Sequence, residues 1–216
     1  MDIHPPTGRI ESIKAYLVHL SMVVFGILIA LGLDGWRESR REHTLVEHSI
    51  AAMRIEIEAN KEQLQRALDG SEKVRDALRK VIEVIEAAIQ RKQRKQTTAI
   101  HGSERYGFNF DAPTLTAGAW QAAIATQALA HMDYMKAQLW SSLYADQDDL
   151  RTFQNELVSV VGRFFVMGSL SDSEDIARLQ QRRDLARELR NRLEVMQQNW
   201  RSLLTHYDAV LSASGQ

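Results

Sequence analysis

The chain has 216 residues, the usual size of one domain. Its 27 Lys and Arg balance 28 Asp and Glu, so its charge gives no electrostatic case for nucleic-acid binding. The lack of cysteine excludes disulfides, thiolate metal sites and cysteine nucleophiles. Three prolines and 11 glycines are too few for a turn-rich all-β design.

After a short tail, residues 1–14, the next nineteen residues, 15–33, contain no Asp, Glu, Lys or Arg. As a helix this run spans about 28 Å, close to the thickness of a hydrocarbon core. Trp36 and Arg37 follow it as interfacial anchors do, and no small-residue cleavage site is present there. We predict an uncleaved, single transmembrane helix over residues 15–36.

Two features inside this helix have alternative interpretations. Gly26 and Ala30 form a small-xxx-small pair that would let two helices approach closely, although glycine is also simply common in membrane helices. His19 is the one ionisable side chain in the run. It either takes part in helix association or proton-linked chemistry, or it reaches the headgroups from near the end of the helix.

A long amphipathic helix is predicted over residues 37–96, because seam positions recur there in steps of three and four residues. These positions are Val46, Ile50, Met53, Ile57, Asn60, Leu64, Ala67, Ser71, Val74, Leu78, Val81, Ile85 and Ala88. Further apolar residues widen the stripe, which favours a bundle over a two-stranded coiled coil. Asn60 would either set the register with another chain or form a hydrogen bond within its own chain.

Residues 97–112 are predicted to form a loop whose aromatic residues pack on the bundle or line a pocket with Trp120. These aromatic residues are Tyr106, Phe108 and Phe110. Pro113 suits the first turn of a new helix, and residues 113–216 would complete the bundle.

Two polar clusters lie within this second part of the chain. Asp146, Asp148 and Asp149 form an acidic group that could bind a hard cation, break the helix, or simply face solvent. Ser171 and Glu174 have the spacing of a capping box that would begin the last helix. That helix repeats apolar residues at heptad-like spacing: Leu179, Ala186, Leu189, Leu193, Met196, Trp200, Leu203, Tyr207 and Val210.

The predicted fold is therefore all-α. One N-terminal transmembrane helix continues into a long coiled-coil-like helix, which packs with three further helices in an elongated antiparallel bundle.

The segment around residues 17–64 resembles a bacterial family of single-pass membrane proteins of unknown function. Members share a VVxGILIAL-type span, a tryptophan just outside it and a charged helix. The matching residues here are Gly26 to Leu31, Trp36, Glu38, Arg40 and Asn60. The resemblance implies an envelope protein. It implies no particular activity, because the family has none to carry over. Members often carry a Glu in the span, where this chain has His19.

The sequence favours a non-enzymatic function. It has no Glu-x-x-His element, no phosphate-binding glycine loop and no Gly-x-Ser-x-Gly, and we predict no catalytic, cofactor or metal site. The leading hypothesis is a self-associating, membrane-anchored scaffold or interaction protein. The alternatives are a small-molecule-sensing bundle and an accessory subunit of a larger membrane complex.

The expected partners are the lipid bilayer, a second or third copy of the chain, and in one alternative another membrane protein. Residues 46–60 are expected to lack cover within the chain, so a dimer or trimer would form through residues 26–60. The alternative is a monomer whose C-terminal helix reaches Val46. Two basic residues precede the span and three follow it closely, which slightly favours a cytoplasmic bundle. The resemblance instead implies a bundle on the periplasmic side of the inner membrane, which is our prediction.

Overall fold

The computed structural model describes residues 13–95, 110–168 and 174–214, and these ranges are all helical or irregular. They form four α-helices, α1 (Ile13–Gln93), α2 (Gly118–Ala125), α3 (Tyr134–Val166) and α4 (Ile176–Ala213), with a short 3-10 helix, η1 (Ala128–His131). The predicted all-α fold is confirmed. The chain divides into two compact units, Met1–His48 and Ser49–Gln216, and α1 contributes to both.

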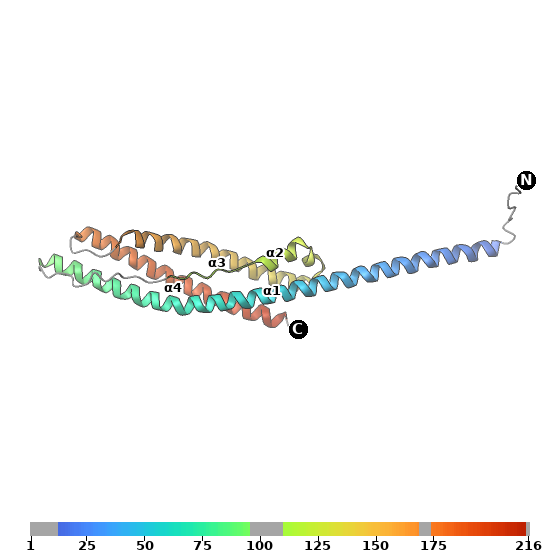
Figure 1. Cartoon of the computed structure of the whole chain (residues 1–216), viewed down its shortest axis with the longest axis horizontal. Helices are drawn as coiled ribbons and strands as arrows, with labels where there is room; N and C mark the ends of the chain where they lie inside the picture. Colours follow the sequence, from blue (N-terminus) through green and yellow to red (C-terminus); the bar gives the residue numbers. More distant parts are fainter. Residues whose placement is uncertain (1–12, 96–109, 169–173, 215–216) are drawn as a thin grey trace, which may run out of the picture. The chain divides into compact units, whose positions relative to one another are not determined.

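The second unit is a helical bundle in which α3 and α4 run side by side with the later part of α1 (Figure 1). Its core contains every predicted seam residue of α1 from Met53 to Ala88, each at most 6% exposed. All nine predicted seam residues of α4 are also buried. Heptad-like spacing therefore identified the buried stripes of both helices, because positions three and four residues apart lie on one helical face.

The apolar residues of helix α3 are buried less regularly than those of α1 and α4. Leu143, Leu150 and Leu157 are buried, whereas Met135 is 68% exposed and Phe153 is 48% exposed. Neither Gly70 in α1 nor the acidic cluster in α3 interrupts its helix. The helix break that the acidic cluster allowed is therefore not formed.

The region after Pro113 differs from the prediction. Residues 110–117 are not helical, and α2 begins at Gly118 rather than in the turn containing Pro113. The helical run ends again at Thr126, and Gln127 adopts a left-handed conformation with φ of 60° before η1. Proline tolerates an extended conformation as well as a helical first turn, so Pro113 alone does not define a helix start.

The predicted capping box is also wrong. Ser171 lies outside the described residues, and α4 begins later, with the side chain of Asp175 accepting a hydrogen bond from the Arg178 amide at 2.8 Å. Glu174 is instead buried and forms a 2.7 Å ion pair with Arg182. Arg182 also donates to the Gly168 carbonyl at 2.6 Å and to the Met167 carbonyl at 2.7 Å, so it satisfies carbonyl groups at the end of α3.

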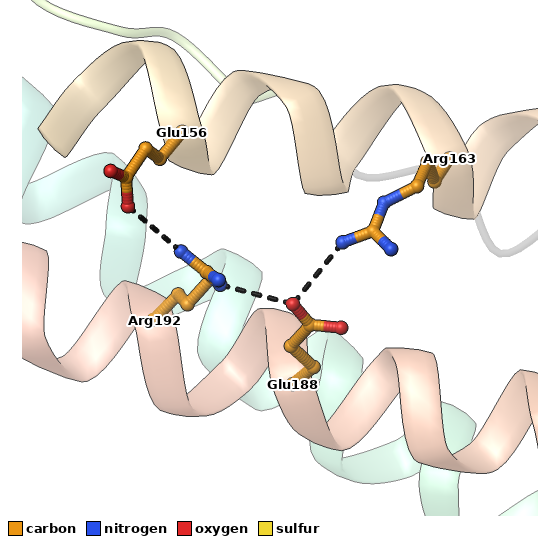
Figure 2. A network of polar contacts seen from close by, with 4 residues as sticks. All are labelled: Glu156, Arg163, Glu188 and Arg192. Carbon is orange, nitrogen blue, oxygen red and sulfur yellow. Dashed lines mark hydrogen bonds and ion pairs between the residues drawn. The ribbon is translucent and has the colours of Figure 1, made fainter. Parts of the chain in front are cut away.

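Polar contacts on the outer face connect α3 to α4. In Figure 2, Arg192 lies between Glu156 and Glu188, and Arg163 reaches Glu188 from α3, each with a nitrogen–oxygen distance of 3.1 Å. All four side chains are substantially exposed, so solvent screens these ion pairs. They favour one register of the two helices but contribute little to stability.

Candidate functional site

The first unit carries the predicted transmembrane segment. Among the described residues, α1 is the one helix long and apolar enough to cross a membrane, and none of its apolar window is buried. Such a segment near the N-terminus is typical of a membrane anchor or a signal sequence. His19 and Ala30 are exposed, and a Cβ added at Gly26 would meet nothing within 4 Å.

The structure divides the five predicted seam residues for oligomerisation into two groups. Val46 and Ile50 are half-buried. Met53, Ile57 and Asn60 are completely buried by the chain's own helices. The expectation that residues 46–60 lack cover within the chain is therefore corrected for these three positions. The reason is that α4 extends far enough for Arg54 to donate hydrogen bonds to the Leu211 carbonyl and the Ser214 hydroxyl.

Asn60 forms hydrogen bonds within its own chain, which was one of its two interpretations. Its amide nitrogen donates to the Thr116 carbonyl at 2.8 Å, and its amide oxygen accepts from the Thr116 amide at 3.0 Å. Its nitrogen also donates to the Gln147 oxygen at 3.1 Å, and that oxygen accepts from the Tyr207 hydroxyl at 2.7 Å. One buried group of side chains thus joins α1, α3 and α4 to residue 116.

The same pattern extends along residues 113–119, which we call the latch. Its backbone groups bind side chains of α1 and α3. Gln154 donates to the Pro113 carbonyl, the Thr114 amide donates to Gln63, and Gln147 donates to the Thr116 carbonyl. Because these contacts satisfy backbone groups that a helix would otherwise pair, the latch can remain non-helical up to Ala117.

Glu56 holds the end of the latch, where α2 begins. One carboxylate oxygen accepts from the Ala119 amide at 3.1 Å, and the other accepts from the Tyr144 hydroxyl at 2.8 Å. A carboxylate at a helix N-terminus is favourable, and α2 has no cap from its own N-cap residue. Glu56 therefore supplies the missing cap from another helix.

Two tyrosine hydroxyls in this region are held in their neutral form. Burial, followed by the hydrogen bond to the Glu56 carboxylate, raises the pKa of Tyr144 well above its usual value. Burial is also the largest cause that raises the pKa of Tyr207. Both side chains act as hydrogen-bond donors, which is a structural role rather than that of a base.

The predicted aromatic pocket is assembled only in part. Tyr106 and Phe108 lie outside the described residues, and Phe110 is half-buried. The ring of Trp120 stacks on Tyr144 with centroids 5.1 Å apart, so Trp120 packs against the bundle. A cavity of about 180 Å³ adjoins the latch. It is lined by Pro113, Thr114, Leu115, Gln147, Arg151 and Gln154.

Within the described ranges, no three His, Cys, Asp or Glu side chains are grouped so that they could hold a metal ion. In the acidic cluster, Asp146 pairs with His206 of α4 at 2.7 Å and Asp148 pairs with Arg151 at 3.5 Å. Two of the three carboxylates therefore make polar contacts with neighbouring side chains at the surface of the bundle.

Sequence reasoning missed most of the latch contacts, although a signal was present. Glu56, Asn60 and Gln63 follow one another by four and three residues on α1, and Gln147 and Gln154 are seven residues apart on α3. Polar side chains at these spacings occupy one helical face beside the apolar seam. Such a polar face predicts a partner with hydrogen-bonding groups, and here that partner is the latch backbone.

Comparisons of the chain with protein-family models, with curated proteins and with solved structures gave no significant match.

Proposed function

We propose that this protein is a single-pass, membrane-anchored helical scaffold that self-associates through its apolar helix. The observation that carries the proposal is the contrast in burial along α1. None of the apolar window is buried, whereas the same helix from Met53 onward is part of a bundle core. A long helix that is apolar all round needs a lipid environment or other helices to cover it.

Membrane insertion is tested first, with a tag at each end of the chain. The expected result is that both tags remain on one polypeptide of full mass in the membrane fraction after alkaline carbonate extraction. Loss of the N-terminal tag would instead identify a cleaved signal sequence. Release of the intact chain into the soluble fraction would contradict an anchor.

Self-association is proposed to occur at Gly26 and Ala30, where small residues permit close helix contact. Gly26→Ile should reduce cross-linking between copies in membranes and shift the mass in mild detergent toward a single chain of 24.6 kDa. Gly32→Ile is the matched control, because a Cβ at either glycine meets nothing within 4 Å. Equal cross-linking in both variants would contradict this contact.

The role as a scaffold predicts that the membrane-extracted protein retains macromolecules. A pull-down in mild detergent, read by mass spectrometry, should recover copies of this chain. Recovery of one other membrane protein in constant proportion would instead support an accessory subunit, and a retained small molecule would support a sensing bundle.

We propose that the bundle lies on the periplasmic side of the bacterial inner membrane, on the basis of the resemblance noted in the sequence. Single-cysteine variants at Ser12 and at the exposed Ser142 test this placement. An impermeant maleimide applied to intact cells with a permeabilised outer membrane should label position 142 and not position 12. The reverse pattern would place the bundle in the cytoplasm.

A further inference from the structure

Residues 34–42 of α1, which follow the apolar segment, carry three arginines and three acidic residues on different sides of the helix. At about 100° per residue, Arg37, Arg40 and Arg41 occupy an arc of about 100°. Asp34, Glu38 and Glu42 occupy a neighbouring arc of about 80° by the same geometry. The local charge sums to zero, yet one face of the helix is entirely basic.

The three arginine side chains are exposed, and none forms an ion pair within the described part of the chain. Several arginines of the bundle differ, since Arg182, Arg187 and Arg192 each pair with a carboxylate. The basic face also lies roughly opposite Val46, the seam position of this unit. Contacts made through the seam would therefore leave the arginines accessible.

Trp36 fixes the depth at which this basic face begins. Trp36 is 57% exposed and lies three residues beyond Leu33, where the apolar run ends. The guanidinium of Arg40 lies over the Trp36 ring, 4.7 Å from its centroid. Tryptophan favours the headgroup level of a bilayer, so the stacked guanidinium would be held at the level of the lipid phosphates.

We propose that Trp36 and the face formed by Arg37, Arg40 and Arg41 bind the phosphate headgroups of anionic phospholipids. The inference rests on the proposed membrane anchor and adds a lipid class to it. Guanidinium groups bind phosphate oxygens in a bidentate geometry, and unpaired arginines beside a membrane favour lipids with net negative charge. Free phosphate lacks the acyl chains that would place it beside Trp36, so we assign the phospholipid as the ligand.

The test uses the full chain in nanodiscs that contain equal amounts of phosphatidylglycerol and phosphatidylethanolamine. Native mass spectrometry counts the lipids that remain bound when the protein is released from the nanodisc. The wild type should retain phosphatidylglycerol preferentially, and R37Q/R40Q/R41Q should lower that preference about fivefold or more. The control R66Q/R91Q/R94Q removes the same charge from three exposed arginines farther along the chain and should leave the preference unchanged.

Three outcomes would overturn the proposal: no preference in the wild type, an equal loss in the control, or displacement of the lipid by millimolar inorganic phosphate. Carbonate extraction of each variant distinguishes this failure from failure of the anchor. A protein that stays in the membrane without lipid preference contradicts the lipid site alone, whereas a protein that is extracted contradicts both proposals.

Discussion

Between residues 16 and 33 of α1, the large hydrophobic side chains are 45–73% exposed, whereas those buried between Met53 and Ile89 of the same helix are at most 6% exposed. The two regions differ in the distribution of apolar residues around the helix. The first is apolar on all sides, so no single neighbour within a chain could cover it. The second is apolar along one stripe, which α3 and α4 can cover. A continuous helix can thus be stable in two environments when the distribution of apolar residues around it changes along its length.

The largest effect is expected from a charge placed on the buried stripe. Ile57→Asp introduces a carboxylate with no partner at a fully buried position and should lower the free energy of unfolding by about 4 kcal/mol. Ile55→Asp is the matched control, because Ile55 lies on the opposite side of the helix and is 73% exposed. Chemical denaturation followed by circular dichroism measures both. A similar loss in the two variants would contradict the assignment of the stripe.

The buried polar side chain of Asn60 should contribute almost as much to the free energy of unfolding as an apolar core side chain. Asn60→Ala leaves the Thr116 amide and carbonyl with fewer partners and opens a small cavity, so we expect a loss of about 3 kcal/mol. Faster hydrogen exchange across residues 113–119 should accompany it, because the latch loses its central attachment. Asn155→Ala, at an exposed position of α3, should change neither quantity. Unchanged exchange in Asn60→Ala would contradict the role of the latch contacts.

The raised pKa values of Tyr144 and Tyr207 predict that the bundle, and not the apolar segment, loses stability at high pH. The folded state holds these phenolic protons more tightly than the unfolded state. The resulting stability is complete below about pH 10 and is lost as pH rises above the unfolded pKa. Each tyrosine should reduce the free energy of unfolding by about 1.4 kcal/mol per pH unit in that range.

Denaturation curves collected between pH 8 and pH 11.5 test this pH dependence. Tyr207→Phe should give a shallower decline above pH 10 than the wild type. Tyr134→Phe removes a tyrosine that is 75% exposed and should keep the wild-type decline. If Tyr207→Phe and Tyr134→Phe have the same profile, burial of the Tyr207 hydroxyl does not cause the loss of stability at high pH.

The smallest effect is expected on the solvent side of the bundle. Glu188→Gln removes the carboxylate that contacts both Arg163 and Arg192 (Figure 2). We expect a loss below about 1 kcal/mol that disappears in high salt, because exposed ion pairs are screened. Glu194→Gln, an exposed α4 position, is the control. A loss as large as that of Asn60→Ala would show that this network does more than align the two helices.

The helical class and the buried stripes of α1 and α4 could be predicted from the sequence. Spacing of three and four residues is a property of the helix itself, so Leu64 or Leu193 can be assigned to a core without knowledge of its partner. The apolar run was recognisable for the same reason, because length and composition alone define a segment that can cross a membrane.

Partner choice was decided by the tertiary structure. Asn60 had two compatible roles, between chains or within one, and the presence of Thr116, Gln147 and Tyr207 around it decided for the second. Pro113 allowed a helix start, yet side chains from α1 and α3 satisfy the surrounding backbone, and the chain stays non-helical up to Ala117. Local sequence determines which conformations and faces are available to a segment. Contacts between residues far apart in the chain select among them, since a buried hydrogen bond forms only where its partner is brought into reach.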